Sequence, residues 1–294
     1  EMCIRDRSRA EGVPQEHILC GNGAADLIFR LVWAQKPRRA LVTAPTFAEY
    51  ATALESVGCT VERFFLREQE DFAVTDAFCA AIRPGVDMVF LCQPNNPTGQ
   101  LTTLPLVEQI LHRCAACGTL LVVDECFLDF LPDHALHTAK GLLGEGDLVI
   151  LKAFTKLYGM AGVRLGYALS ADTAVLEQMQ ACGQPWGVSS LAQAAGLAAL
   201  EETAYVEKVR ALIAEQRPRL TTGLRALGLR VLDGRANYLL FQAPETLGEA
   251  LRQRGAVLRS CANYPGLGPG WYRTAVRTGS ENEQLLKLLA EVLE

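Results

Sequence analysis

Three cations lie in an unusually apolar stretch of the chain. Residues 152–167 read KAFTKLYGMAGVRLGY, so Lys152, Lys156 and Arg164 stand among aromatic, glycine and aliphatic residues. Such side chains could lay their stems on apolar surface and keep their charges in water. Alternatively, one lysine is a nucleophile, held where its amine can lose its proton. The second interpretation requires other polar groups to meet this stretch in the folded protein.

Polar residues follow three of the expected strands at the point where each strand ends. Asn96 follows DMVFLC, Asp124 follows TLLVV, and the third strand, DLVILKAF, is followed by Thr155, Lys156 and Arg164. Ligands of open parallel sheets bind at the carboxyl ends of the strands, so we expect one shared site. Each residue alone could have a plainer role, in a turn, at a helix start or on the surface.

A glycine-containing segment near the start of the chain adds a fourth element. Residues 21–29 read GNGAADLIF and place Gly23, Ala24 and Ala25 at the expected start of an amphipathic helix. Backbone N–H groups there would bind an anion, preferably a phosphate. The dinucleotide-binding fingerprint fits poorly, because Asp26 takes its third glycine position and no strong strand is expected immediately before it. The segment therefore predicts a phosphate site without nucleotide-binding machinery.

Short apolar runs alternate with helix-like segments in the first part of the chain. Near-continuous runs of Val, Ile and Leu are typical of strands that are covered on both faces. Their alternation with helices predicts an α/β fold with a mostly parallel central sheet and helices on both faces. The expected strands are residues 39–45, 59–65, 87–94, 119–125, 147–154 and 163–170.

The pattern changes after residue 170. It is nearly all helical as far as about residue 227, and short strands are then expected at LRVLD, NYLLFQ, AVLRSC and WYRTAVRT, before a helix from Glu281. This order predicts a small α+β domain attached to a long helix.

We therefore divide the chain into a large domain over residues 18–200 and a connecting helix with the small C-terminal domain over residues 201–294. Residues 1–17 are interpreted as a truncated N-terminal segment. The first seven of them, EMCIRDR, show no periodicity and no apolar run of a signal peptide, and we interpret them as a translated sequencing adaptor.

Composition excludes several classes of protein. Of the 294 residues, 50% are hydrophobic and 21% are charged, with a net charge of −5, which is typical of a soluble globular protein. Lys and Arg are spread along the chain, so no nucleic-acid surface is expected. No apolar run approaches the roughly 18 residues of a membrane-spanning helix.

The ten cysteines show no disulfide framework. Cys114 and Cys117 form a CxxC pair, but no second pair follows, so we expect no metal site and interpret the two as small apolar residues packed on a helix. Cysteines without a framework are typical of a reducing compartment, which predicts a cytoplasmic protein.

Three motifs, taken together, resemble the class I and II aminotransferase family of fold-type I enzymes. They are NNPTG, VVDE and TKLYGMAGVRLGY, and the likeness extends from about Ile18 to the C-terminus. The resemblance implies pyridoxal 5′-phosphate as cofactor. Lys156 would bond covalently to the cofactor aldehyde and later move protons at the substrate Cα. Asp124 would pair with the pyridine nitrogen and keep it protonated.

The resemblance also implies roles for other cofactor contacts. Asn96 would donate a hydrogen bond to the ring oxygen and also contact the substrate. Tyr50, in APTFAEY, would stack on the ring, although an aromatic residue on an amphipathic helix is the plainer interpretation. The cofactor phosphate would be held by Gly23, Ala24, Ala25, Thr155 and Arg164.

Arginines near the C-terminus are the expected substrate contacts. Arg273 stands where the family has the arginine that binds the substrate α-carboxylate, which a planar guanidinium can grip with two hydrogen bonds. Arg259 stands where relatives with phosphorylated substrates bind the phosphate. Arg277 could serve either role or face solvent, and on a continuing strand it would lie on the same face as Arg273.

Two branches of the family are the most similar. Three features favour the threonine-phosphate decarboxylases of cobalamin biosynthesis over the histidinol-phosphate aminotransferases. They are the segment GNGAADL, the ending YRTAVRTGSEN, and Phe127 in place of a tyrosine. The substrate would be a small phosphorylated amino acid or amine. Decarboxylation and transamination differ in which Cα bond stands perpendicular to the ring. The sequence does not report this orientation, so both reactions stay open. A catalytically silent protein, or one inactivated by truncation, also stays open. The family resemblance further implies a homodimer.

Overall fold

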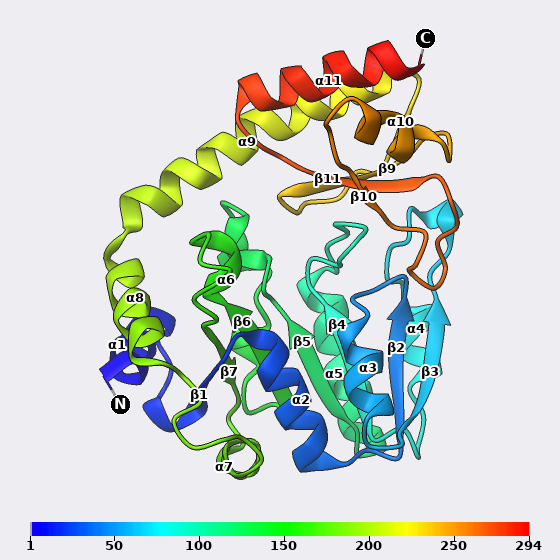
Figure 1. Cartoon of the computed structure of the whole chain (residues 1–294). Coiled ribbons are helices and arrows are strands. Elements are labelled where there is room, and N and C mark those ends of the chain that lie inside the picture. Colours follow the sequence, from blue (N-terminus) through cyan, green and yellow to red (C-terminus); the bar gives the residue numbers. More distant parts are fainter. Residues whose placement is uncertain (1, 294) are drawn as a thin grey trace.

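The structure, a computed structural model, describes residues 2–293. A seven-stranded sheet with helices on both faces forms the larger part, and a four-stranded sheet lies beyond its carboxyl edge (Figure 1). The large sheet has the order β1-β7-β6-β5-β4-β2-β3. Its strands are β1 (Ile18–Gly21), β2 (Arg39–Ala44), β3 (Thr60–Phe65), β4 (Met88–Cys92), β5 (Leu120–Asp124), β6 (Leu148–Ala153) and β7 (Gly166–Leu169).

The mostly parallel sheet is confirmed. Strands β3, β2, β4, β5 and β6 run parallel, whereas β7 runs antiparallel to both β6 and β1. No strong strand was expected before the glycine turn, and the structure has a short four-residue strand there, β1, which ends at Gly21. The expected strand over 163–170 begins only at Gly166, because Arg164 has φ +61 and interrupts extended backbone.

Side chains of the central strands alternate between two apolar layers. Leu120 and Val122 of β5 pack in the layer under α2 (Ala24–Gln35), α3 (Glu49–Glu55) and α7 (Thr173–Ala181). Leu121 and Val123 pack in the opposite layer, under α4 (Ala77–Ala81), α5 (Leu104–Cys117) and α8 (Ser190–Glu201). The same alternation sends Asp124 and Glu125, at the end of β5, to opposite sides of the sheet.

A small antiparallel sheet with two helices forms the C-terminal part. Its order is β10-β11-β9-β8, with bounds β8 (Arg230–Val231), β9 (Tyr238–Gln242), β10 (Arg259–Ser260) and β11 (Trp271–Ala275). The long helix α9 (Thr203–Ala226) leads into it, and α10 (Leu247–Gln253) and α11 (Gly279–Leu293) pack with α9 around one apolar cluster (Figure 1). Across residues 2–293, every helix is too short or too polar to cross a bilayer.

The N-terminal segment forms helix α1 (Met2–Glu11), which packs beside α8. A helix there does not decide whether the first seven residues are a translated adaptor, and Glu1 lies outside the described residues. That interpretation and the domain boundary at residue 200 therefore stay predictions.

Lys152 belongs to a buried ion cluster on the side of the sheet away from α2. Its Nζ lies 2.7 Å from Asp129 Oδ1 and 3.6 Å from Glu125 Oε2. Glu125 is fully buried and accepts hydrogen bonds from Ala139 N and Thr138 Oγ1. Burial favours the neutral amine, but Asp129 and Glu125 outweigh it and raise the pKa of Lys152. Lys152 is therefore a structural cation and stays protonated.

Replacing Lys152 by methionine should be strongly destabilising. The variant Lys152→Met removes the ion-pair partner of both Asp129 and Glu125, so we expect the free energy of unfolding to fall by about 3–5 kcal/mol in urea denaturation. Lys208→Met, on the exposed surface of α9, is the matched control and should change it by less than about 0.5 kcal/mol. A loss below about 1 kcal/mol for Lys152→Met would show that the cluster contributes little.

Candidate active site

Two connected cavities lie at the carboxyl ends of β4, β5 and β6. The smaller, about 150 Å³, is enclosed by these strand ends and the start of α2, and the larger, about 660 Å³, lies against the small sheet. Lys156 and Phe127 line both cavities, so the two meet there. The smaller cavity brings together seven of the expected cofactor residues: Ala24, Ala25, Asn96, Asp124, Thr155, Lys156 and Arg164.

Asp124 is the last residue of β5 and is only 6% exposed. Its Oδ1 accepts a hydrogen bond from Cys126 N at 3.0 Å, and its Oδ2 accepts one from Tyr50 Oη at 2.6 Å. These two donors leave the carboxylate directed at the cavity with its position fixed. A buried carboxylate held in this way can hold a cationic N–H group in the cavity.

The stacking role expected for Tyr50 does not fit the structure. Tyr50 is fully buried and does not line the cavity; its ring stacks on Phe90 at 4.7 Å, and its hydroxyl points to Asp124. Helix α3 begins at Glu49, so its first turn carries Tyr50 into the apolar layer. Phe47, which precedes the helix, lines the cavity instead. Sequence reasoning missed Phe47, although its position directly after a predicted strand could have indicated it.

The start of α2 forms the phosphate end of the smaller cavity. Gly23 is the N-terminal capping residue with φ +84, and it brings no capping side chain, so the first N–H groups of the helix remain available. A Cβ on Gly23 would lie 2.6 Å from Arg164 Nη2. The guanidinium therefore packs directly against the turn, and its charge adds to that of the helix start. This pair is a ready site for a phosphate.

Lys156 lies on the single-turn helix α6 (Phe154–Leu157), directly after β6. Its Nζ lies over the Phe127 ring, 5.2 Å from the centroid, and its side chain is exposed to the cavities. Lys156 and Asp124 therefore face one cavity, whereas Lys152 lies on the other side of the sheet. An exposed lysine opposite a buried carboxylate can attack an aldehyde placed between them.

Asn96 connects the two cavities. Its side chain is 7% exposed, and its Oδ1 accepts hydrogen bonds from an Arg273 N–H and from Tyr264 Oη. Among residues 2–293 its Nδ2 has no partner, so it remains free to donate to a ligand in the smaller cavity. Arg273 also lies over the Tyr238 ring, at 4.9 Å. The expected carboxylate-binding arginine thus touches the expected cofactor contact.

Arginines dominate the larger cavity. Arg259 and Arg273 are paired neighbours on β10 and β11, and neither has a carboxylate partner among the described residues. Arg277 does not lie on a strand with Arg273 as expected, because β11 ends at Ala275; its Nη2 pairs with Glu281 at 2.7 Å. Sequence reasoning missed Arg254, which follows α10 and also lines this cavity. The cavity therefore suits an anionic ligand.

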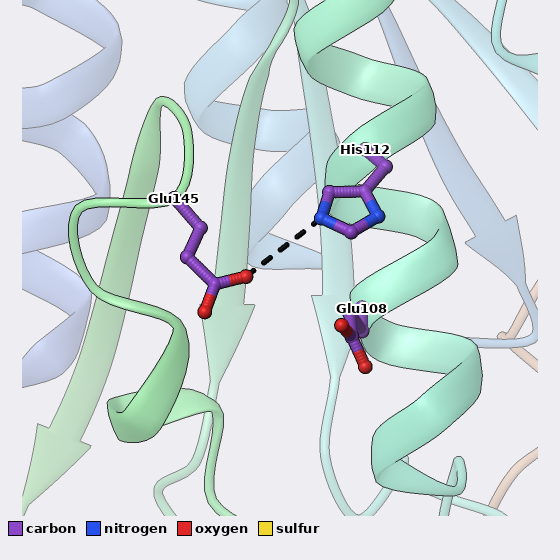
Figure 2. A group of neighbouring side chains, drawn as sticks. All are labelled: Glu108, His112 and Glu145. Carbon is purple, nitrogen blue, oxygen red and sulfur yellow. Dashed lines mark ion pairs between the residues drawn. The ribbon is translucent and has the colours of Figure 1, made fainter.

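A separate cluster of possible metal ligands lies at the opposite edge of the sheet. Glu108 and His112, on α5, face Glu145 before β6, and their ligand atoms lie within 4.8 Å of one another (Figure 2). His112 Nε2 lies 3.7 Å from Glu145 Oε2, and both side chains are exposed. We interpret the cluster as a surface ion pair that takes no part in the cavities.

The fold and the smaller cavity define a class of enzyme. A lysine, a buried carboxylate, an amide donor and a phosphate-binding helix start are the groups that pyridoxal phosphate needs around its aldehyde, ring nitrogen, ring oxygen and phosphate. Each is present in one cavity, and the turn at Gly23 admits a phosphate beside Arg164. The residues therefore fit a pyridoxal-phosphate-dependent enzyme.

Comparisons agree with this class. The family model "Aminotransferase class I and II" matches residues 5–292, and the chain belongs to this family. It is 40% identical over 290 residues to the threonine-phosphate decarboxylase of Salmonella typhimurium, covering 97% of this chain and 79% of the relative.

Histidinol-phosphate aminotransferases are also similar. The Symbiobacterium thermophilum enzyme is 35% identical over 298 residues, covering 99% of this chain and 80% of the relative. The crystal structure of the Clostridium acetobutylicum enzyme superimposes with a TM-score of 0.93 at 25% identity, covering 99% of this chain and 88% of that chain.

The phosphate turn gives a direct test of cofactor binding. In Gly23→Ala the new Cβ displaces the Arg164 guanidinium, so we expect the affinity for pyridoxal phosphate to fall at least tenfold, as on losing a charged hydrogen bond of about 1.5–3 kcal/mol. The matched control is Gly118→Ala, at φ +65 after α5, where a Cβ meets nothing within 4 Å. It has comparable backbone strain and should leave the affinity unchanged. Affinity is measured by absorbance titration with pyridoxal phosphate. Equal affinities of Gly23→Ala and the parent protein would contradict a phosphate site at Gly23 and Arg164.

Proposed function

We propose that the enzyme acts on a small phosphorylated amino acid, with decarboxylation of threonine O-phosphate as the first choice. The main evidence for this proposal is the position of Arg259 and Arg273. They are neighbours on β10 and β11 and line the cavity that Lys156 also lines. Among the described residues neither arginine has a carboxylate partner, and such a pair suits a ligand with two anionic groups. The similarity to a relative named threonine-phosphate decarboxylase supports this choice.

Each residue would have a separate task. Arg273 would hold the substrate carboxylate, and Arg259 the substrate phosphate. When bound, pyridoxal phosphate supplies an electron sink for a bond that breaks at the substrate Cα. Asp124 would hold a proton on the ring nitrogen, and Lys156, at the junction of the cavities, would deliver or remove the proton at Cα.

Further contacts would position the cofactor. Asn96 would donate to the ring oxygen, while Thr155, Arg164 and the backbone at the start of α2 would hold the phosphate. Phe47 takes the stacking position in place of Tyr50. Phe127 offers no hydroxyl and packs edge-on against Tyr238 at 5.1 Å, which leaves Asn96 as the side-chain donor to the ring oxygen.

A histidinol-phosphate-type aminotransferase is the second choice. Relatives of that name match nearly the whole chain. In that reaction Arg259 would hold the phosphate of the amino substrate, and Arg273 the carboxylate of glutamate or 2-oxoglutarate. The choice depends on whether Arg273 turns the Cα–carboxylate bond or the Cα–H bond perpendicular to the ring. A catalytically silent protein is less well supported, because Lys156, Asp124 and Arg164 all line one cavity.

A paired assay distinguishes the two activities. We expect carbon dioxide release from O-phosphothreonine, and no glutamate formation from histidinol phosphate and 2-oxoglutarate. Arg259→Met should lower kcat/KM for O-phosphothreonine about 10–100-fold by removing a charged contact. Arg252→Met, an exposed residue of α10 that pairs with Glu249, is the control and should leave kcat/KM unchanged. Glutamate formation alone would favour the second choice, and no turnover of either substrate would overturn the phosphorylated-substrate proposal.

A homodimer is also part of this proposal. Trp186 is 96% exposed and Leu191 is 82% exposed, and both lie in the segment that joins α7 to α8 and begins α8. Large exposed apolar side chains close in sequence are typical of protein interfaces. The family resemblance favours a second copy of the chain as the partner.

Placing a charge in this surface should weaken the dimer. Trp186→Glu buries an unpaired carboxylate at the interface, so we expect a shift from dimer to monomer at micromolar concentration in analytical ultracentrifugation. Val257→Glu, at an exposed apolar residue in the loop before β10, is the control and should sediment as the parent protein does. Equal sedimentation of Trp186→Glu and the parent would contradict an interface at Trp186.

A further inference from the structure

The hydroxyl of Tyr50 meets two groups that line the smaller cavity, the Asp124 carboxylate and the Cys92 thiol. Its ring is fully enclosed, stacked on Phe90 at 4.7 Å and meeting Phe47 edge-on at 5.5 Å. Its hydroxyl lies 2.6 Å from Asp124 Oδ2, inside the protein and out of reach of the cavity. Tyr50 does not line the cavity, so it would act on a cofactor there through the groups it contacts, of which Asp124 is the charged one.

The direction of this hydrogen bond follows from the surroundings. Burial and the neighbouring carboxylate raise the pKa of Tyr50 well above its usual value, so the phenol stays protonated and donates. The other titratable groups near Asp124 are Cys92, Cys126, Lys156 and Tyr238, and burial raises the pKa of Tyr238 well above its usual value, so that phenol is neutral. Burial raises the pKa of Cys92 to about 12 and raises the pKa of Cys126, so both thiols are neutral. Among the described residues, the donors to Asp124 are therefore the Tyr50 hydroxyl, the Cys126 N–H and the neutral Cys126 thiol.

We propose that Tyr50 is a positioning residue that holds the Asp124 carboxylate toward the cofactor ring nitrogen. A donated hydrogen bond stabilises the charged form of a buried carboxylate, and charged hydrogen bonds are among the strong ones. A carboxylate held in this position can accept a hydrogen bond from a protonated ring nitrogen and so favours that form of the cofactor. The electron sink of the cofactor therefore depends on Tyr50. This inference rests on the cofactor of the proposed function and not on the choice of substrate.

The test uses two cofactors that differ at one atom. Tyr50→Phe keeps the stacked ring and removes the hydroxyl alone. We expect it to weaken binding of pyridoxal phosphate about 10–100-fold, and to change by less than about twofold the binding of the 1-deaza analogue, in which C–H replaces the ring nitrogen. Binding is measured by absorbance titration of the cofactor-free protein without substrate, so the result does not depend on the activity assay.

A matched control removes the same kind of bond elsewhere. Tyr167 is also buried, and its hydroxyl donates to Glu11 Oε1 at 2.5 Å on the far side of the sheet. Tyr167→Phe should leave both affinities unchanged. In the activity assay Tyr50→Phe should lower kcat and leave the substrate KM unchanged, because Tyr50 does not line the substrate cavity.

Three results would overturn the proposal. Equal weakening of both cofactors in Tyr50→Phe would show a packing role, and no weakening of either would show no role. The third result comes from the unaltered protein and so does not depend on whether a variant folds. In ¹⁵N NMR, ring-labelled pyridoxal phosphate bound to this protein should show a protonated ring nitrogen at neutral pH. An unprotonated nitrogen would exclude the role assigned to Tyr50 and Asp124.

Discussion

The alternation of side chains along β5 and β6 is the constraint on which the rest of this protein depends. Adjacent carboxylates at the end of β5 point to opposite sides of the sheet, so Asp124 reaches the cofactor cavity and Glu125 the buried ion cluster. On β6, Lys152 joins Glu125, and the single turn α6 then carries Lys156 to the cavity. Lys152 thus links the ends of β5 and β6 through its ion pair with Glu125, whereas Lys156 is exposed to the cavity, where it can react with a ligand.

The cavity also needs the small C-terminal sheet to lie over the strand ends. Contacts between the two parts are both apolar and polar. Phe72 packs edge-on against Trp271 at 5.6 Å in one apolar cluster. Arg235 donates its backbone N–H to Gly99 O, and its guanidinium pairs with Asp133 at 2.8 Å. Slight burial opposes ionisation of Asp133, but hydrogen bonds from Arg235 and His137 lower its pKa to about 2. These contacts bring β10 and β11, with their arginines, beside Lys156.

Substrate and cofactor contacts are coupled in this arrangement. Arg273 touches Asn96, so the group assigned to the substrate carboxylate also holds the group assigned to the ring oxygen. Tyr50 acts in a similar way from behind Asp124. The cofactor site is thus supported from both sides by residues that need not touch the cofactor. Such support is what holds catalytic groups in position in buried sites.

Strand ends were predictable from sequence, and side-chain directions were not. Apolar runs followed by Asn96, Asp124 and Lys156 were enough to predict an α/β sheet with a site at its carboxyl edge, because a strand covered on both faces must be continuously apolar. The short edge strand β1 escaped this reasoning, since four residues make no such run.

What the sequence by itself determined is therefore the order of the elements and the residue types at their ends. Tertiary structure alone decided that Tyr50 supports Asp124 while Phe47 lines the cavity, because the start of α3 sets which aromatic residue turns inward. It also decided that Arg277 leaves β11 to pair with Glu281, and that Lys152 and Lys156, four residues apart, lie on opposite sides of one sheet. Packing between segments that are distant in the sequence sets the directions of these side chains. A local sequence pattern carries no information on such packing.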